Sequence, residues 1–388
     1  MRDKLKHFPV NWIDGMKIGK HHFIAQDDAW KNALFDMSSL LVSPLRYGIL
    51  PSSAAGEDNF NVKIAIDNQN TMRVSVLSCQ AITQGGMRIS IPSLSVSGQP
   101  ERDGVPSTSF QFSNAGNEPA WWVVLMIHPY ERQPAGSPDL AENPPRYPYV
   151  LPAYSVQVVS DSQFRQYEEN PYALVIGKAV SSGAEVRVDD EYIPPCFSIN
   201  SHPDLLSLYS ELDKFQGTIE LKCSQIVQKI YKKNQQNEIS ELVLFLCDRV
   251  ILHLGQTITQ MRWLMMHDSP AALFANLASL SRVMKNAIDL RIGSGKDEML
   301  TYLSEWCELR QGELETLLTS LAGLRYDNND INGNIQKIIS FVKVTSKLFE
   351  TLSKLEFIGK KKESGIFVKE ETDTGQDAQA KARRRFFG

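Results

Sequence analysis

The chain has 388 residues, 42% hydrophobic and 22% charged, with a formal net charge of −4 at pH 7. These values are typical of a soluble globular protein of two domains, and the charge gives no sign of nucleic-acid binding. The five cysteines include no C-x-x-C pair, so neither a disulfide framework nor a zinc knuckle is expected. No apolar run approaches the ~18 residues of a membrane span, and none follows the basic N-terminus, so we expect no secretory signal and a cytoplasmic protein.

The opening segment, residues 7–30, combines an acid-Gly-Met turn with several large apolar side chains. Gly15 permits a tight turn that a residue with a Cβ atom resists. Phe23, Trp30 and Leu34 follow at steps of seven and four, which predicts one stripe of a helix. Such a stripe either closes the domain that follows or binds a partner, and the sequence favours neither alternative.

The next part of the chain has the pattern of short antiparallel strands. Apolar and polar residues alternate from Phe60 to Ile66, which is the period of a half-buried strand. The turn sequences DNQN and GG separate this run from two more alternating runs, so residues 60–91 predict a meander. Further strands, separated by loops rich in Pro and Gly, make an antiparallel β-sandwich the expected fold of this half. These strands are expected at residues 107–113, 120–128, 154–160, 172–180 and 184–193.

The loop expected at residues 129–148 is rich in proline and long for a compact domain. Loops of this kind are often functional, so it is a candidate contact with a partner. The adjacent Trp121 and Trp122 precede it in a strand. One ring is expected to pack inward and its neighbour to meet another sheet or a subunit.

After residue 197 the pattern becomes helical. Ser201 and Asp204 form a helix start signal, with Pro203 in the first turn. The apolar stripe that follows can serve as a seam between subunits or as the core of a bundle within one chain. Its members are Leu205, Leu208, Leu212, Phe215 and Ile219. Four further helices are expected at about residues 238–266, 270–292, 296–321 and 335–357.

The last residues, 361–388, lose this periodicity and are rich in charged residues, Gly and Gln, which predicts a flexible tail. Its two basic clusters flank an acidic middle, so nucleic-acid binding is not expected. The expected domains are therefore a β-sandwich at 1–197, a helical bundle at 198–360 and this tail. Candidate docking residues in the tail are Ile366, Phe367, Val368, Arg383, Arg384, Arg385, Phe386 and Phe387.

Patterns of enzyme chemistry are missing from the sequence, which has no nucleotide-binding loop, nucleophile elbow or H-E-x-x-H helix. His21 and His22 are adjacent, and on a helix their side chains point about 100° apart, so they are not expected to share a metal ion. Neighbouring acids such as Glu168 and Glu169 are commonly solvated. We therefore expect no catalytic residues, no cofactor and no metal, and a protein that acts through contacts.

The opening stretch resembles the N-terminal signature of the TssK family, the baseplate proteins of type VI secretion systems. That signature is close to W-x-E-G-M-x-L-x-P-Q-H-F-Q-x-x-D. The chain departs from it at Lys20, His21 and Ile24, where the family prefers Pro, Gln and Gln. The stretches EYIPPCFSINSHPDLL and DSPAALFANLASLSRVM also resemble family segments, so the similarity covers both halves. The signature positions, with an Asp in place of Glu, are Trp12, Asp14, Gly15, Met16, His22, Phe23 and Asp27.

This resemblance implies a β-sandwich similar to the shoulder domain of phage receptor-binding proteins, followed by a helical neck. It implies a homotrimer that binds wedge proteins of the TssF and TssG type, as an adaptor at the inner face of the cytoplasmic membrane. The family's head domain binds the membrane complex. Here only about thirty residues follow the expected neck, too few for a core, so we expect that head to be missing. The tail is then the candidate contact with a membrane-anchoring protein.

Two alternatives remain open. A phage-tail-like receptor-binding or adhesin protein would share the shoulder fold. A β-sandwich glycosidase would need two carboxylates about 5–10 Å apart in a cleft.

Overall fold

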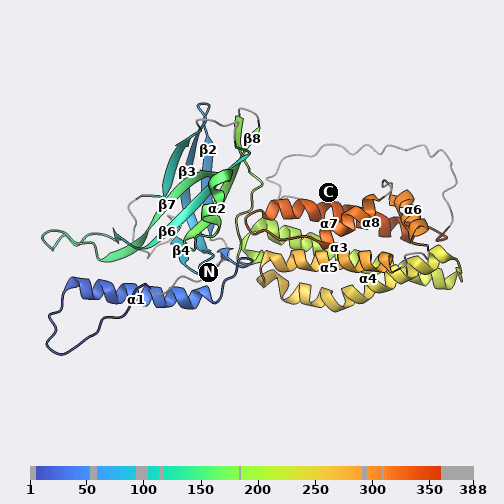
Figure 1. Cartoon of the computed structure of the whole chain (residues 1–388), viewed down its shortest axis with the longest axis horizontal. Coiled ribbons are helices and arrows are strands. Elements are labelled where there is room, and N and C mark those ends of the chain that lie inside the picture. The colour runs from blue at the N-terminus through green and yellow to red at the C-terminus, as the bar shows by residue number, and fades with distance from the viewer. Residues whose placement is uncertain are drawn as a thin grey trace. The chain divides into compact units, whose positions relative to one another are not determined.

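The computed structural model describes residues 6–52, 59–92, 104–112, 118–182, 185–290, 295–307, 310 and 312–359. It divides into two compact units, which we call unit 1 and unit 2 (Figure 1). Unit 1 comprises Met1–His202 and Asp327–Asn332, and unit 2 comprises Pro203–Tyr326 and Gly333–Gly388. The expected tail, 361–388, lies outside the described residues, and so do its candidate docking residues.

The first sheet of unit 1 is antiparallel and is built around one long strand, β3 (Thr71–Ile82), which pairs with the other four strands. Its apolar side chains alternate, so that Met72, Val74 and Val76 are buried on one face. β3 pairs with β2, which precedes it in the chain, and with β4, which follows it, so the predicted meander is confirmed. The other strands are β1 (Gly48–Ile49), β2 (Phe60–Ile66), β4 (Arg88–Ile91) and β5 (Ser107–Gln111).

The second sheet has the order β7-β6-β8-β9, and its neighbouring strands are antiparallel. The sequence predicted that β6 ends at His128. The strand instead crosses a bulge between His128 and Arg132 and continues. Pro129 lies in this bulge, where its missing N–H interrupts no regular ladder. The predicted loop therefore shortens to residues 136–148. The strands are β6 (Ala120–Ala135), β7 (Tyr149–Ser160), β8 (Ala173–Ser182) and β9 (Glu185–Val188).

The adjacent Trp121 and Trp122 connect β6 to the layers on both of its faces. The ring of Trp121 packs against Phe110 of β5, with ring centroids 5.3 Å apart, and so joins the two sheets. The ring of Trp122 points the other way and stacks on Phe164 of α2 (Asp161–Glu168), at a centroid distance of 4.4 Å. Both rings are buried. Neighbours in a strand point to opposite faces, which accounts for these two roles.

A short segment from the second half of the chain, residues 327–332, belongs to unit 1. The hydroxyl of Tyr47 donates to Asn329 Oδ1 at 2.9 Å, and Asn328 Nδ2 donates to the carbonyl oxygen of Tyr47 at 3.1 Å. All three residues are buried, so the polar segment forms part of the interior of unit 1. The two units also divide between residues 202 and 203, a few residues after the boundary that was expected at 197/198.

The described elements of unit 2 are all helices. The predicted fourth helix is in fact two, α6 and α7, and Gly312 precedes α7 in a left-handed conformation with a φ of +79°. Among the described helices, α4 has the length and hydropathy of a membrane span, a test that the core helix of a soluble protein also passes. Its Leu246, Val250 and Leu254 are buried. The helices are α3 (Pro203–Lys232), α4 (Glu238–Trp263), α5 (Pro270–Asp289), α6 (Lys296–Cys307), α7 (Glu313–Ala322) and α8 (Ile331–Lys354).

The apolar stripe of α3 lies inside unit 2. Its five side chains are between 0 and 6% exposed. Phe215 meets Phe341 of α8 with ring centroids 6.3 Å apart, and Gln216 donates from Nε2 to Asn276 Oδ1 of α5. Other helices of the same chain therefore cover the stripe, and the expectation of a seam between subunits at this place is corrected. The residues concerned are Leu205, Leu208, Leu212, Phe215 and Ile219.

Candidate functional site

The signature residues build a turn and a helix start near the N-terminus of unit 1. Gly15 has a φ of +79°, a left-handed conformation that favours glycine. The N–H of Met16 closes the turn with a 3.2 Å hydrogen bond to the carbonyl oxygen three residues earlier. The helix α1 (Lys20–Ser39) begins after Gly19, whose N–H donates to His22 Nδ1 at 3.1 Å. His22 therefore caps α1, as the third helical residue does in a capping box.

The adjacent histidines contact each other. Nε2 of His21 lies 3.1 Å from Nε2 of His22, and their ring centroids are 3.8 Å apart. Because His22 accepts at Nδ1, its neutral ring carries the proton on Nε2 and donates it to His21. In the described part of the chain, no group of three or more His, Cys, Asp or Glu side chains could hold a metal ion.

Trp12 packs over the start of α1. Its ring centroid lies 6.0 Å from that of His22 and 6.2 Å from that of Phe23. These contacts bring three signature residues into one aromatic cluster, in which Trp12 is 46% and Phe23 58% exposed. Of the other signature residues, Asp14 is exposed and Met16 is half-buried.

Polar side chains attach α1 to the rest of unit 1. Asp28, whose side chain is 12% exposed, pairs with Arg132 of β6 at 3.0 Å. Asp27 pairs with the same guanidinium at 3.3 Å. Asn32 Oδ1 accepts the backbone N–H of His7 at 3.2 Å. The last signature residue, Asp27, therefore joins α1 to the bulge of β6 in the β6–β7 hairpin.

The opposite side of α1 is a row of large apolar side chains that face solvent. Their exposed fractions lie between 58 and 70%. A surface helix ordinarily turns its apolar side to the core, so α1 is inverted. A contiguous exposed apolar patch usually marks a contact with another molecule. We call the row the α1 apolar face. It comprises Phe23, Trp30, Leu34 and Met37 on α1, drawn in dark blue in Figure 1, and Leu41 in the turn that follows.

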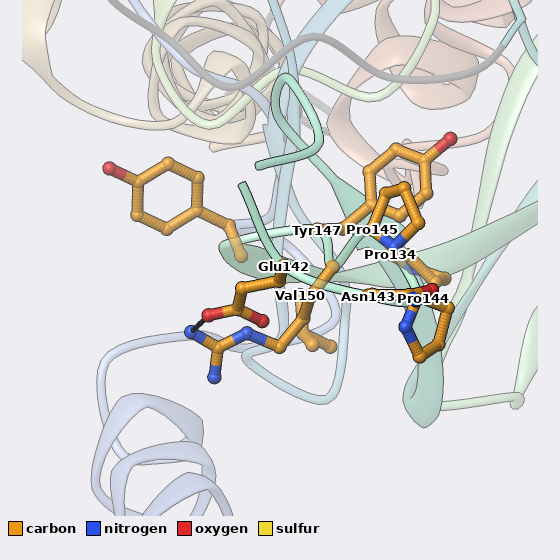
Figure 2. Close-up of a pocket in the computed structure, with 9 residues that line it drawn as sticks. Pro134, Glu142, Asn143, Pro144, Pro145, Tyr147 and Val150 are labelled. Carbon is orange, nitrogen blue, oxygen red and sulfur yellow. Dashed lines mark hydrogen bonds and ion pairs between the residues drawn. The ribbon is translucent and has the colours of Figure 1, made fainter. Parts of the chain in front are cut away.

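The β6–β7 hairpin projects beyond the other strands and ends in a second exposed apolar surface (Figure 1). Arg146 pairs with Glu142 at 2.8 Å within residues 136–148. A cavity of about 680 Å³ opens here, lined by prolines, two tyrosines and this ion pair (Figure 2). Prolines and aromatic rings without a cluster of acids or bases suit the binding of a polypeptide. We call the exposed apolar residues Leu140, Tyr147, Tyr149 and Val150 the hairpin tip.

Residues in the bulge of β6 also hold α1 and the segment before it. The ring of Tyr130 packs on that of His7, with centroids 4.1 Å apart, and burial raises the pKa of Tyr130 to about 12. Lys31 Nζ donates to the carbonyl oxygen of Pro129 at 3.4 Å. Tyr130 and Arg132 were not singled out from the sequence, because both lie in the stretch predicted to be a loop and no motif marks them.

In comparisons with known proteins, this chain shows similarity to solved structures. No family model and no curated protein matches the chain. A crystal structure of TssK is 16% identical, with a TM-score of 0.47, and the match covers 88% of this chain and 69% of that chain. In structure, the chain is similar to TssK.

Two solved assemblies that contain similar chains extend this finding. A TssK-TssF-TssG baseplate subcomplex of the type VI secretion system matches at 15% identity and a TM-score of 0.39, over 89% of this chain and 99% of that chain. A baseplate complex of the type VI secretion system matches at 13% identity and a TM-score of 0.42, with the same coverage of 89% and 99%. Because these TM-scores lie below 0.5, we argue the function from the residues of this chain.

Proposed function

We propose that this chain is a TssK-like structural component of a type VI secretion baseplate and not an enzyme. In this role it is a cytoplasmic adaptor that binds wedge proteins of the TssF and TssG type. It links them toward the membrane-docking apparatus at the inner face of the cytoplasmic membrane. Its two sheets would form the shoulder-like β-sandwich, the helices of unit 2 the neck, and three copies the working assembly.

The observation that carries this proposal is the attachment of α1 by signature residues. Asp27 pairs with Arg132 at the bulge of β6 in the β6–β7 hairpin. Trp12 and Phe23 pack at the start of α1, which His22 caps. Among the residues that resemble the TssK signature, Asp27 therefore fixes α1 beside the hairpin, and Trp12, His22 and Phe23 form the start of that helix.

We assign wedge binding to the hairpin tip. Its exposed Leu140 and Tyr147 are the kind of apolar anchor that a partner protein buries in a pocket. The solved subcomplex to which the chain is similar contains TssK together with TssF and TssG, and we propose partners of this class for this chain.

Co-purification of the tagged full chain with TssF- and TssG-type proteins from the same genome tests this function. Leu140→Asp is expected to lower wedge capture at least about tenfold, because burying a Leu contributes roughly 1.5–3 kcal/mol. Leu290→Asp is the matched control in unit 2, since Leu140 is 81% and Leu290 73% exposed. This control should capture the wedge as the unsubstituted chain does.

Equal capture by the two variants would contradict the assignment to the hairpin tip. A full chain that captures neither wedge protein would contradict the baseplate function itself.

A further inference from the structure

Two rows of lysines follow the C-terminal turns of α3 and α8, and we call them the lysine rows. In α3 successive lysines are seven and four residues apart, and in α8 they are four and seven apart. Such steps place side chains on one side of a helix. The first and last lysines of a row are separated by roughly 16 Å of helix. The rows comprise Lys222 and Lys229 of α3 with Lys233 directly after it, and Lys343, Lys347 and Lys354 of α8.

The two rows lie side by side because α3 and α8 run parallel within unit 2. Near the middle of both helices, the rings of Phe215 and Phe341 have centroids 6.3 Å apart. Near the C-terminal end of both, Lys229 Nζ donates to the carbonyl oxygens of Ser353 and Leu355. Contacts that advance in the same direction along both helices are those of a parallel pair. The lysine rows therefore share one end of unit 2.

This end of the two helices is strongly basic. Residues 220–233 and 343–356 contain seven lysines and three glutamates, a net charge of +4, whereas the whole chain has −4. Glu350 pairs with Lys354 at 2.7 Å. The hydrogen bond from Lys354 lowers the pKa of Glu350, and the charge of Lys222 on the other row lowers it further. Glu350 therefore lies between the rows, and positive charge remains in excess around it.

The helix dipole accounts for only part of this accumulation. Cations are favourable in the last turn of a helix, and the effect falls off within that turn. Lys222, Lys343 and Lys347 lie at least seven residues before the ends of their helices. The lysines also repel one another, because burial and then the charge of Lys233 lower the pKa of Lys229. An external anion would relieve this repulsion.

A membrane surface that contains anionic lipids offers the complementary charge. Clusters of about four to eight Lys or Arg residues beside a membrane bind anionic headgroups. Lysine suits this contact, because its ammonium group is a point charge on a flexible stem and needs no fixed geometry. The ring of Phe357, which is 39% exposed, lies 4.5 Å from Lys233 Nζ. It places an apolar group beside the charges, as in proteins that lie on a membrane surface.

We propose that the lysine rows bind the anionic headgroups of a lipid membrane. The choice of a lipid surface over an acidic polypeptide rests on the proposed function, which places the chain at the inner face of the cytoplasmic membrane. There the anionic leaflet presents an extended negative surface. The contact is electrostatic and has no stereospecific pocket, so it depends on the number of charges in the rows and on salt.

Co-sedimentation of the full chain with lipid vesicles tests the inference. Vesicles of phosphatidylcholine with about 30% phosphatidylglycerol supply the anionic surface, and vesicles of phosphatidylcholine alone are the neutral comparison. The chain should bind the anionic vesicles and not the neutral ones. Salt at about 1 M should release it, because the screening length then falls to about 3 Å.

Lys222→Gln combined with Lys343→Gln removes one charge from each row. Each lysine near an anionic surface strengthens binding about fivefold, so this variant should bind about 25-fold more weakly. Lys17→Gln combined with Lys63→Gln is the matched control, because it removes two exposed lysines of unit 1. The control should bind as the unsubstituted chain does, and so should Lys222→Arg combined with Lys343→Arg, which keeps the charge. Circular dichroism should show all three variants folded.

The inference is wrong if the unsubstituted chain does not prefer anionic vesicles, or if the Lys222→Gln, Lys343→Gln variant binds them as well as its control. Retention on immobilised polyglutamate without vesicle binding would assign the rows to an acidic polypeptide and would also overturn it. A chain that captures the wedge proteins but binds no vesicles leaves the baseplate function standing and this inference refuted. A chain that binds anionic vesicles through the rows but captures no wedge protein gives the reverse result.

Discussion

Arg132→Ala tests the attachment of α1 to the β6–β7 hairpin. The guanidinium donates to Asp28 Oδ1 at 3.0 Å, to Asp27 Oδ2 at 3.3 Å and to the carbonyl oxygen of Ile24 at 3.3 Å. The side chain of Asp28 is 12% exposed, and leaving such a carboxylate without this partner costs about 1–3 kcal/mol. Asp27 is 60% exposed, so its pairing contributes less than about 1 kcal/mol. We therefore expect α1 to lose about 2–3 kcal/mol of attachment.

Hydrogen exchange of the full chain measures this loss where it occurs. A cost of 2–3 kcal/mol corresponds to local opening that is about 30- to 150-fold more frequent, so the amides of α1 should exchange faster by that factor. Arg146→Ala is the control on the same hairpin. Arg146 pairs with Glu142 at 2.8 Å, but the two side chains are 72 and 42% exposed, so its removal should cost less than about 1 kcal/mol.

Two results would refute this reasoning. One is equal exchange of the α1 amides in Arg132→Ala and Arg146→Ala. The other is strict additivity between Arg132→Ala and Asp28→Ala, because residues that pair directly should show coupling in a double-mutant cycle.

Three further predictions concern the interior of each unit. Gly48→Ala should lower the thermal denaturation midpoint by roughly 6–12 °C, which is about 3 kcal/mol. A Cβ there would lie 1.9 Å from the carbonyl oxygen of Pro195, in a backbone with a φ of +118°. Asn329→Ala should cost about 1–3 kcal/mol in urea denaturation, because the buried hydroxyl of Tyr47 loses its acceptor. Burial lowers the pKa of His253, so the unfolded chain takes up a proton first as the pH falls. The stability of unit 2 should therefore fall below about pH 6.5, and His253→Gln should lessen that fall in urea denaturation followed by helix circular dichroism.

Each of these predictions has a result that contradicts it. Gly104→Ala is the control for Gly48→Ala, since Gly104 has a φ of +83° but no heavy atom within 4 Å of an added Cβ. Equal destabilisation by the two alanines would show that the contact with Pro195 is unimportant. An Asn329→Ala variant as stable as the unsubstituted chain would exclude a role for the Tyr47 hydrogen bond. An unchanged pH profile in His253→Gln would assign the acid sensitivity to other groups.

The presence of a helix at α1 was predictable from the sequence, whereas its orientation was not. The steps between Phe23, Trp30 and Leu34 define an apolar stripe whichever way that stripe points. The orientation depends on Arg132, which lies 104 residues beyond its partner Asp28 in a stretch predicted to be a loop. Local spacing contains no information on a contact of that range.

Long-range contacts also determine the environment of α3, whereas β2, β3 and β4 depend on local pattern. Alternation and short turns are local, so the meander could be predicted from residues 60–91. The three-four spacing from Leu205 to Ile219 suits a subunit seam and a bundle core equally. In the structure the stripe is a bundle core, because side chains such as Phe341, more than a hundred residues away, pack against it. Likewise, the pattern identified His22 as a signature residue, but its hydrogen bond to Gly19 was needed to show that it caps a helix.

The interior of unit 1 can be completed only late in synthesis on the ribosome. The hydroxyl of Tyr47 is bonded to Asn329, 282 residues further along the chain. At about 5–20 residues per second, translation reaches that partner roughly 14–56 s after Tyr47 has been added. The interior of unit 1 around Tyr47 therefore stays incomplete while most of the helices of unit 2 are made. A nascent chain released before residue 327 would keep the Tyr47 hydroxyl without its native acceptor.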